Sequence, residues 1–177
     1  MKELLEAIEN DSLVKMRALL DNGIDLSKPV IIGEEYELDE PDEIGILFYA
    51  IRTGASLEAI ELLLEYGLDI QALDSDKISA LDTAVKFKRK DVVELCIEKG
   101  LDLNSTKRRS GILPLLLASC FGDIEMVELL LKHGADLNAT DSSGITAKDY
   151  AKKLGQKKMV EFLDEKGAIF NLYPNEE

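Results

Sequence analysis

Apolar side chains recur at helical spacing along most of the chain. Three stretches align without gaps: AIELLLEYGLD at 59–69, VVELCIEKGLD at 92–102 and MVELLLKHGAD at 126–136; MVEFLDEKGA at 159–168 is a shorter copy. Their apolar positions follow the i, i+3, i+4, i+7 rule for one buried helix face. The pattern predicts a helix in each stretch, and the glycine that follows suits a left-handed helix stop.

Two sets of residues recur along the chain with the same period. The closing glycines Gly67, Gly100, Gly134 and Gly167 are spaced by 33, 34 and 33 residues. The small alanines Ala50, Ala84, Ala118 and Ala151 are spaced by 34, 34 and 33 residues, and each predicts a first, closely packed helix before the second. An earlier copy, MRALLDNGID at 16–25, makes five repeats. A period of this length decides the architecture by itself.

The best-matched stretch, ASCFGDIEMVELLLKHGADLNA at 118–139, resembles the ankyrin-repeat family, whose unit of about 33 residues is a β-turn followed by two helices. The resemblance covers nearly the whole chain. It implies an all-α solenoid of about five stacked helix-turn-helix repeats with β-turn or hairpin fingers and a cap at each end. One domain of residues 1–177 is expected, with repeats at about 1–26, 43–70, 74–103, 107–137 and 141–170.

The family signature TPLHxA is altered in every repeat that carries it. The chain reads GILFYA at 45–50, SALDTA at 79–84, LPLLLA at 113–118 and TAKDYA at 146–151, and none of these keeps the histidine. In the family, the threonine and histidine usually tie the turn to the helix by hydrogen bonds. Locally weaker turns are therefore expected, with apolar stacking between repeats dominating stability.

An acidic insertion separates the first two repeats. From Asp25 to Ala50 is 25 residues, against 15 or 16 at the later junctions, so about ten residues are inserted within 29–43. A β-prone run, a glycine and seven carboxylates between Glu34 and Glu43 predict an extended acidic hairpin. Three roles are open: a solubilising loop, a cation site at Asp39, Asp42 and Glu43, and a protein contact. The predicted contact residues are Glu34, Glu35, Tyr36 and Glu37.

The resemblance also implies a concave surface built from turn tips and the exposed ends of first helices. Those ends map to Arg52 and Thr53, Lys86 and Phe87, Cys120 and Phe121, and Lys153 and Leu154. Phe87, Phe121 and Leu154 occupy one equivalent position in successive repeats. They are candidate binding anchors, or they pack against the next repeat.

Two groups of cations have alternative interpretations. Lys107, Arg108 and Arg109 lie in a turn, where they suit carboxylate or phosphate recognition or balance neighbouring acids. The last repeat is rich in lysine, which predicts a solvated polar cap or a basic docking patch. These lysines are Lys148, Lys152, Lys153, Lys157 and Lys158.

No motif points to catalysis, a metal or a cofactor. Cys96 and Cys120 lie within apolar helical patterns, His133 precedes a closing glycine, and the chain has neither CxxC nor HExxH. Neither a GxSxG nor a phosphate-binding GxxxxGK[ST] motif is present. A noncatalytic protein with no catalytic residues, no metal site and no cofactor is expected.

Charge favours a protein partner. The net charge is −14, of which −11 falls in residues 1–68, and this argues against binding to nucleic acid or an anionic membrane. The leading hypothesis is a protein-protein interaction module that uses its groove and hairpin tips. The alternative is a stoichiometric inhibitor or immunity-type protein that blocks a basic enzyme with the acidic N-terminal third. A basic protein is thus one candidate for the unknown partner.

Location and assembly are predicted from the ends of the chain. Acids stand near the N-terminus where a signal peptide needs a basic region, so a cytoplasmic protein is expected, with delivery as an effector also open. Both terminal repeats are expected to be capped, which predicts a monomer.

Overall fold

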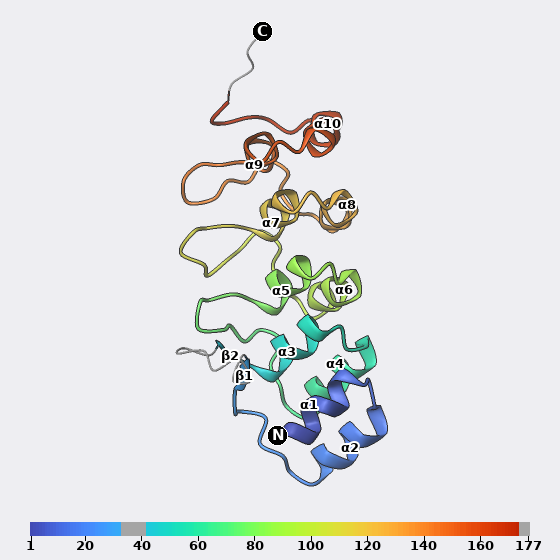
Figure 1. Ribbon diagram of the computed structural model, residues 1–177. Helices are drawn as coiled ribbons and strands as arrows, with labels where there is room; N and C mark the ends of the chain where they lie inside the picture. Colours follow the sequence, from blue (N-terminus) through green and yellow to red (C-terminus); the bar gives the residue numbers. More distant parts are fainter. Residues whose placement is uncertain (33–41, 174–177) are drawn as a thin grey trace. The chain divides into compact units, whose positions relative to one another are not determined.

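A computed structural model describes residues 1–32 and 42–173 of the 177-residue chain. Two compact units divide the chain, an N-terminal unit at Met1–Asp74 and a C-terminal unit at Ser75–Glu177. Each predicted repeat contains one pair of short helices (Figure 1), which confirms the repeat architecture. The single domain and the repeat boundaries stay predictions.

The N-terminal unit holds two helix pairs and a two-stranded sheet. Its elements are α1 (Lys2–Glu9), α2 (Leu13–Asp21), β1 (Val30–Ile32), β2 (Asp42–Ile44), α3 (Ile46–Thr53) and α4 (Leu57–Glu65). The strands are antiparallel, with Val30 opposite Ile44, and they form the base of the predicted hairpin. Residues 33–41 lie outside the described residues, and with them the predicted contacts Glu34, Glu35, Tyr36 and Glu37.

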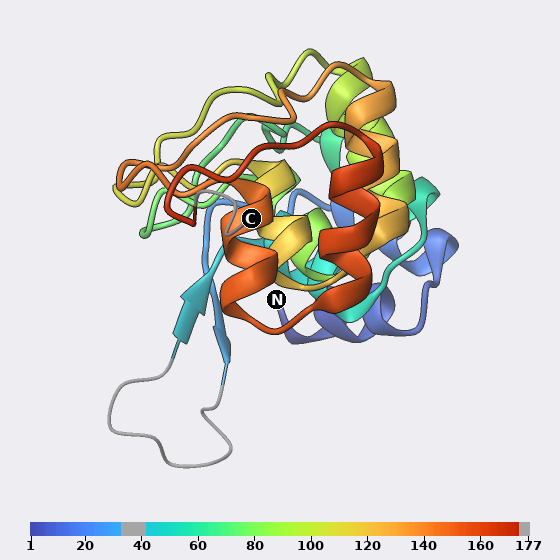
Figure 2. The ribbon, with the colours of Figure 1, turned by 90° about the horizontal axis from the view of Figure 1, so that it is seen from above.

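The C-terminal unit holds three helix pairs. They are α5 (Ala80–Lys86) with α6 (Lys90–Glu98), α7 (Pro114–Cys120) with α8 (Ile124–Lys132), and α9 (Ala147–Lys153) with α10 (Lys157–Glu165). The first helices α5, α7 and α9 pack on one another in order, and each also packs on its own second helix (Figures 1 and 2). Their central alanines are fully buried, so small side chains allow the close approach.

Aspartate replaces the missing signature histidine in two repeats. Asp82 Oδ2 accepts a hydrogen bond from the Ser79 backbone N–H (3.1 Å), and Ser79 Oγ accepts one from the Asp82 N–H (3.0 Å). Thr146 and Asp149 form the same reciprocal capping box on α9. The expected weakening is therefore offset at α5 and α9, whereas α3 and α7 start without a side-chain cap bond.

A residue in the left-handed backbone conformation follows each first helix of the C-terminal unit. After α5 this residue is Lys88, with φ at 57°, and the two later turns place Gly122 and Gly155 there. A left-handed φ cannot continue a right-handed helix, so the helix ends before this residue and the chain turns into the second helix. Such a φ costs a residue with a side chain, here Lys88, about 1–2 kcal/mol.

The last repeat is closed by a buried lysine. Lys148 is only 5% exposed, whereas the corresponding positions of α5 and α7 are Leu81 and Leu115. Its ammonium group donates to the Ala168 carbonyl (3.2 Å), pairs with Asp164, and lies 4.2 Å from the Phe170 ring centroid. The prediction of a solvated lysine cap is therefore wrong for Lys148, because the segment after α10 covers it.

Candidate protein-binding surface

Three partly exposed apolar residues stand on consecutive first helices of the C-terminal unit. Phe87, Phe121 and Leu154 are the C-cap residues of α5, α7 and α9, and they are 37%, 44% and 52% exposed. We call these three residues the ladder. Since packed helices lie about 8–10 Å apart, successive rungs are separated by a similar distance.

The ends of the first helices fix the positions of the three rungs. Each rung makes the last backbone bond of its helix, from Phe87 N to Thr83 O (3.0 Å), from Phe121 N to Leu117 O (3.2 Å) and from Leu154 N to Tyr150 O (3.0 Å). The left-handed residue comes next and diverts the chain. The rung thus stands at the rim of the helix, where its side chain is only half covered.

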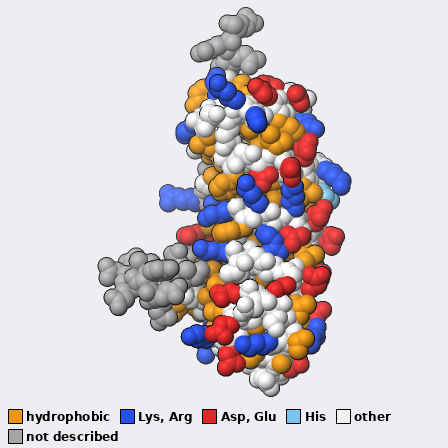
Figure 3. All heavy atoms as spheres, turned by 45° about the vertical axis from the view of Figure 1, so that its right-hand side comes forward, with side chains coloured by type: hydrophobic (Ala, Val, Ile, Leu, Met, Phe, Trp, Pro, Cys, Tyr) orange, Lys and Arg blue, Asp and Glu red, His pale blue; other side chains and the backbone are white. Residues whose placement is uncertain are grey.

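Lysines flank both ends of the ladder. The Lys86 ammonium lies 5.8 Å from the Phe87 ring centroid, and Lys88 is exposed beside it. Lys153 is exposed beside Leu154. Within the described part of the chain, these three lysines make no ion pair. Figure 3, which shows one face of the molecule, has basic, acidic and apolar side chains interspersed.

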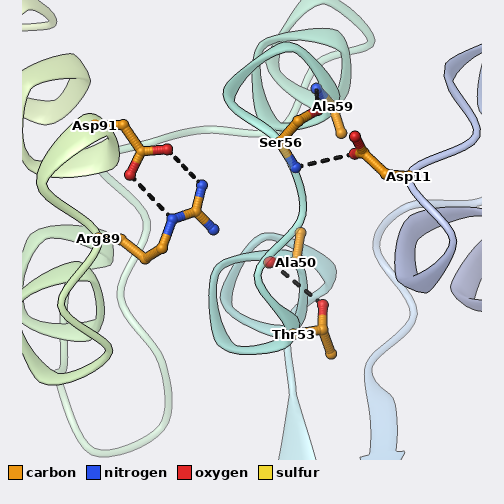
Figure 4. A network of polar contacts seen from close by, with 7 residues as sticks. All are labelled: Asp11, Ala50, Thr53, Ser56, Ala59, Arg89 and Asp91. Carbon is orange, nitrogen blue, oxygen red and sulfur yellow. Dashed lines mark hydrogen bonds and ion pairs between the residues drawn. The ribbon is translucent and has the colours of Figure 1, made fainter.

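Nearby carboxylates are already engaged. Arg89 binds Asp91 through two nitrogens, at 3.0 and 2.6 Å, as Figure 4 shows. Glu125 pairs with Lys90, which lowers the pKa of Glu125. Asp123 accepts the Met126 N–H (3.1 Å) at the start of α8. These three carboxylates therefore have partners other than Lys86 and Lys88, whereas the charge of Lys153 helps to lower the pKa of Asp141.

A hydrogen-bonded pair joins α9 to the finger that precedes it. Tyr150 Oη donates to Asp141 Oδ2 at 2.7 Å, and Asp141 is 8% exposed. Burial opposes ionisation of Asp141, but bonds from Tyr150, Ile145 and Ser143 outweigh it and hold its pKa below the usual value. Burial, followed by the charge of Asp141, raises the pKa of Cys120 to about 11, so this thiol stays protonated at neutral pH.

The predicted basic turn lies in the finger before α7. Lys107 and Arg109 are exposed and Arg108 is half-buried. The Gly111 N–H donates to the Arg108 carbonyl (3.0 Å), and Ser142 Oγ of the next finger donates to the Ser110 carbonyl (2.6 Å). The exposed cations thus extend from a backbone held by its neighbour.

Arg52 belongs to the other compact unit. It is exposed in the last turn of α3, and its predicted contact with a partner is untested. The turn that follows is well bonded (Figure 4): Ser56 Oγ accepts the Ala59 N–H (3.1 Å), and Asp11 accepts the Ser56 N–H (2.9 Å).

Sequence reasoning missed a pair of asparagines that join successive repeats. Asn104 Oδ1 accepts the Asp136 N–H (2.8 Å), while its Nδ2 donates to the Gly134 carbonyl (3.0 Å). Asn138 Oδ1 likewise accepts the Ile169 N–H (3.0 Å). Both asparagines follow a closing glycine by four residues, a regularity that could have revealed them.

Two other kinds of site are absent from the described residues. No helix there is long and apolar enough to cross a membrane. No group of three or more His, Cys, Asp or Glu side chains is arranged to hold a metal ion within residues 1–32 and 42–173.

Known proteins are similar to this chain in sequence. L-asparaginase of Dirofilaria immitis is 30% identical over 97% of this chain, which spans 28% of that protein. An ankyrin repeat protein of fowlpox virus, FPV244, is 28% identical over 85% of the chain and 20% of its own length. Glycerophosphocholine phosphodiesterase gde1 of Schizosaccharomyces pombe is 30% identical over 52% of the chain and 8% of its own length. The chain thus spans less than a third of the length of each of these relatives.

The family assignment follows from the repeat and from one further match. The sequence profile described as "Ankyrin repeats (3 copies)" matches residues 4–107 and 99–173. Together these ranges include nine of the ten helices of the described residues in full, and all of α1 except its first two residues. The chain belongs to the ankyrin-repeat family.

Proposed function

We propose that this chain is a noncatalytic protein-binding module whose main contact surface is the ladder together with the finger that carries Lys107, Arg108 and Arg109. Ankyrin repeats generally mediate protein-protein interaction, and the family is generally noncatalytic. The observation that carries the proposal is the placement of Phe87, Phe121 and Leu154, all partly exposed, at one position of three consecutive helices.

The exposure of the three rungs favours binding over packing as their role. A rung that served only as packing would be buried like the alanines of the same helices, which are fully covered. Exposed aromatic groups on a rigid scaffold lose little side-chain entropy when a partner covers them, so they make good anchors. The finger adds cations that suit carboxylate groups on a partner.

The test is affinity capture from the native cell extract, followed by a direct binding measurement with the purified candidate. Three chains are compared: the wild type, Phe87→Ala with Phe121→Ala, and a matched control with Ile169→Ala and Leu172→Ala. The control removes apolar residues that are 57% and 49% exposed in the same compact unit. The ladder variant is expected to lose at least tenfold in affinity, since hot-spot truncations cost about 2 kcal/mol or more.

Thermal melting accompanies the binding measurement. A ladder variant that melts close to the wild type but no longer binds supports the proposal. Equal affinity of the ladder variant and the wild type opposes it, and a collapse of folding would assign the rings to the core.

The inhibitor alternative stays a prediction. It depends on the acidic insertion, whose residues 33–41 lie outside the described residues. A fourth chain with residues 30–42 replaced by a short turn tests it. If capture of a basic enzyme is lost only in this chain, the inhibitor hypothesis replaces the ladder proposal.

A further inference from the structure

Charge and spacing at the ladder indicate what kind of partner it suits. Resting on the proposed function, we propose that the ladder binds an extended acidic peptide segment with apolar side chains at every third position. The apolar side chains cover Phe87, Phe121 and Leu154, and the carboxylates between them meet the flanking lysines.

The sign of the charge comes from the side chains that remain unpaired. Lys86, Lys88 and Lys153 are exposed at the two ends of the ladder without an ion pair in the described residues, whereas Asp91, Asp123 and Glu125 each have a partner. Among these six groups, those without an ion pair or a hydrogen-bonded partner are the positive ones, and Lys86 and Lys88 carry most of this charge because Lys153 also acts on Asp141. A peptide with carboxylates is complementary to them, and one with lysines is repelled.

Helix dipoles do not reverse this sign. The first helices end at the ladder with partial negative charge, but the second helices begin three residues after each rung with partial positive charge. The opposed ends lie close together and largely offset one another. The lysine ammonium groups are full charges and dominate.

The spacing argues for an extended segment. Rungs about 8–10 Å apart match three residues of a polyproline II segment, which advances about 9.3 Å per turn. Side chains three apart in such a segment point to the same side, so successive apolar residues reach successive rungs. A β-strand reaches a similar length in three residues but points its third side chain to the opposite face.

A nucleic acid suits this surface less well. The C-terminal unit has 16 Lys or Arg and 17 Asp or Glu, so its overall charge is close to zero and gives no broad basic surface. The rungs themselves need apolar or aromatic groups to cover them. A peptide supplies both kinds of group in one segment.

The experiment measures fluorescence anisotropy with synthetic peptides of 13 residues and the full chain. The probe has leucine at every third position and aspartate or glutamate between. One comparison peptide keeps the leucines and has lysine between them, and another has the probe's composition in scrambled order. The chain is tested as wild type, Phe121→Ala, Lys86→Glu with Lys153→Glu, and a charge-matched control, Lys99→Glu with Lys132→Glu. The control lysines are exposed at the far ends of α6 and α8.

The acidic probe is expected to bind at least about tenfold more tightly than either comparison peptide. Reversing Lys86 and Lys153 should weaken it about tenfold, as expected for losing several exposed ion pairs, while the control pair changes affinity less than twofold. Raising the salt concentration should weaken the wild type more than the reversed variant.

Three results would overturn the proposal in distinguishable ways. If the lysine peptide binds best and Phe121→Ala abolishes that binding, the ladder is still a binding surface and only the acidic assignment fails. If no peptide binding responds to Phe121→Ala, the ladder proposal fails as well. If the chain dimerises in sedimentation and the reversed variant does not, a second copy occupies the ladder.

Discussion

The two compact units are built from the same kind of helix pair, but they differ in net charge and in the hydrogen bonds that join their repeats. The N-terminal unit has 5 Lys or Arg and 18 Asp or Glu, a net charge of −13, whereas the C-terminal unit has 16 and 17, a net charge of −1. One fold therefore presents two different electrostatic surfaces. Repeats conserve the apolar core and leave the surface free to vary.

The hydrogen bonds that link neighbouring repeats also come from different side chains in the two units. In the N-terminal unit, exposed carboxylates supply them: Glu9 accepts from Tyr49, Asp21 from Tyr66 and Asp11 from the Ser56 N–H. In the C-terminal unit, amide side chains of Asn104, Asn138 and Gln156 bond to backbone groups of a neighbouring repeat or of the segment after α10. Two of the three N-terminal links join two side chains, and such bonds define a spacing between repeats less closely than bonds to fixed backbone positions.

The largest expected effect comes from Asp149, a buried carboxylate of the C-terminal unit. Asp149 is fully buried and accepts bonds from Thr146, Asn171 and Leu172. Asp149→Ala leaves these buried donors unpaired, which should cost about 3 kcal/mol of unfolding free energy. Asp11→Ala, which removes one exposed link of the N-terminal unit, should cost under about 1 kcal/mol. Urea unfolding measures the free energy of unfolding of both variants. Equal losses would contradict the expected difference between the two units.

Acid should weaken the stabilising effect of Asp149. Burial opposes ionisation of Asp149, but its hydrogen bonds outweigh this and lower its pKa. A carboxylate with a lowered folded-state pKa stabilises the fold fully above its unfolded pKa of about 3.9, and this stabilisation is lost as pH falls through the folded pKa. The difference between wild type and Asp149→Ala should therefore shrink below about pH 4. A difference that stays constant from pH 7 to pH 3 would contradict the assignment.

The asparagine links should have the next largest effect. Asn104→Ala and Asn138→Ala should each cost about 1 kcal/mol, because each removes hydrogen bonds that join neighbouring segments. The residue corresponding to Asn104 in the preceding repeat is Gln71, whose side chain has no hydrogen bond in the described residues. Gln71→Ala is the matched control and should change stability by less than about 0.5 kcal/mol. Hydrogen exchange at the Asp136 and Ile169 amides locates the loss, and unchanged protection there would refute the links.

The sequence predicted the helix pairs because their evidence is periodic. The closing glycines and central alanines recur with the repeat, so each copy supports the others. The placement of Phe87, Phe121 and Leu154 at helix ends could be predicted for the same reason. Exposure at those positions depends on how far the next repeat covers them, which only the packed structure gives.

The sequence-based predictions failed where one repeat differs from the others. Lys148 stands at a position that is leucine in the preceding repeats, and an isolated lysine indicates solvent. Its burial depends on Ala168, Asp164 and Phe170, which follow the last regular copy. Asp82 and Asp149 stand at the histidine position of the TPLHxA signature, and the S/T-x-x-D pattern there indicates a capping box that comparison with the signature alone does not reveal.

The smallest effect tests backbone strain in the two compact units. Lys77 and Asp11 both have positive φ, 63° and 50°. Lys77→Gly should stabilise the protein by about 0.5–1 kcal/mol, since relief of left-handed strain exceeds the entropy that glycine adds to the unfolded chain. Asp11→Gly relieves the same strain but removes the bond to the Ser56 N–H, so its net effect should be near zero. Thermal melting of the two variants decides the point, because an equal gain in both would mean that the Asp11 link contributes nothing to the N-terminal unit.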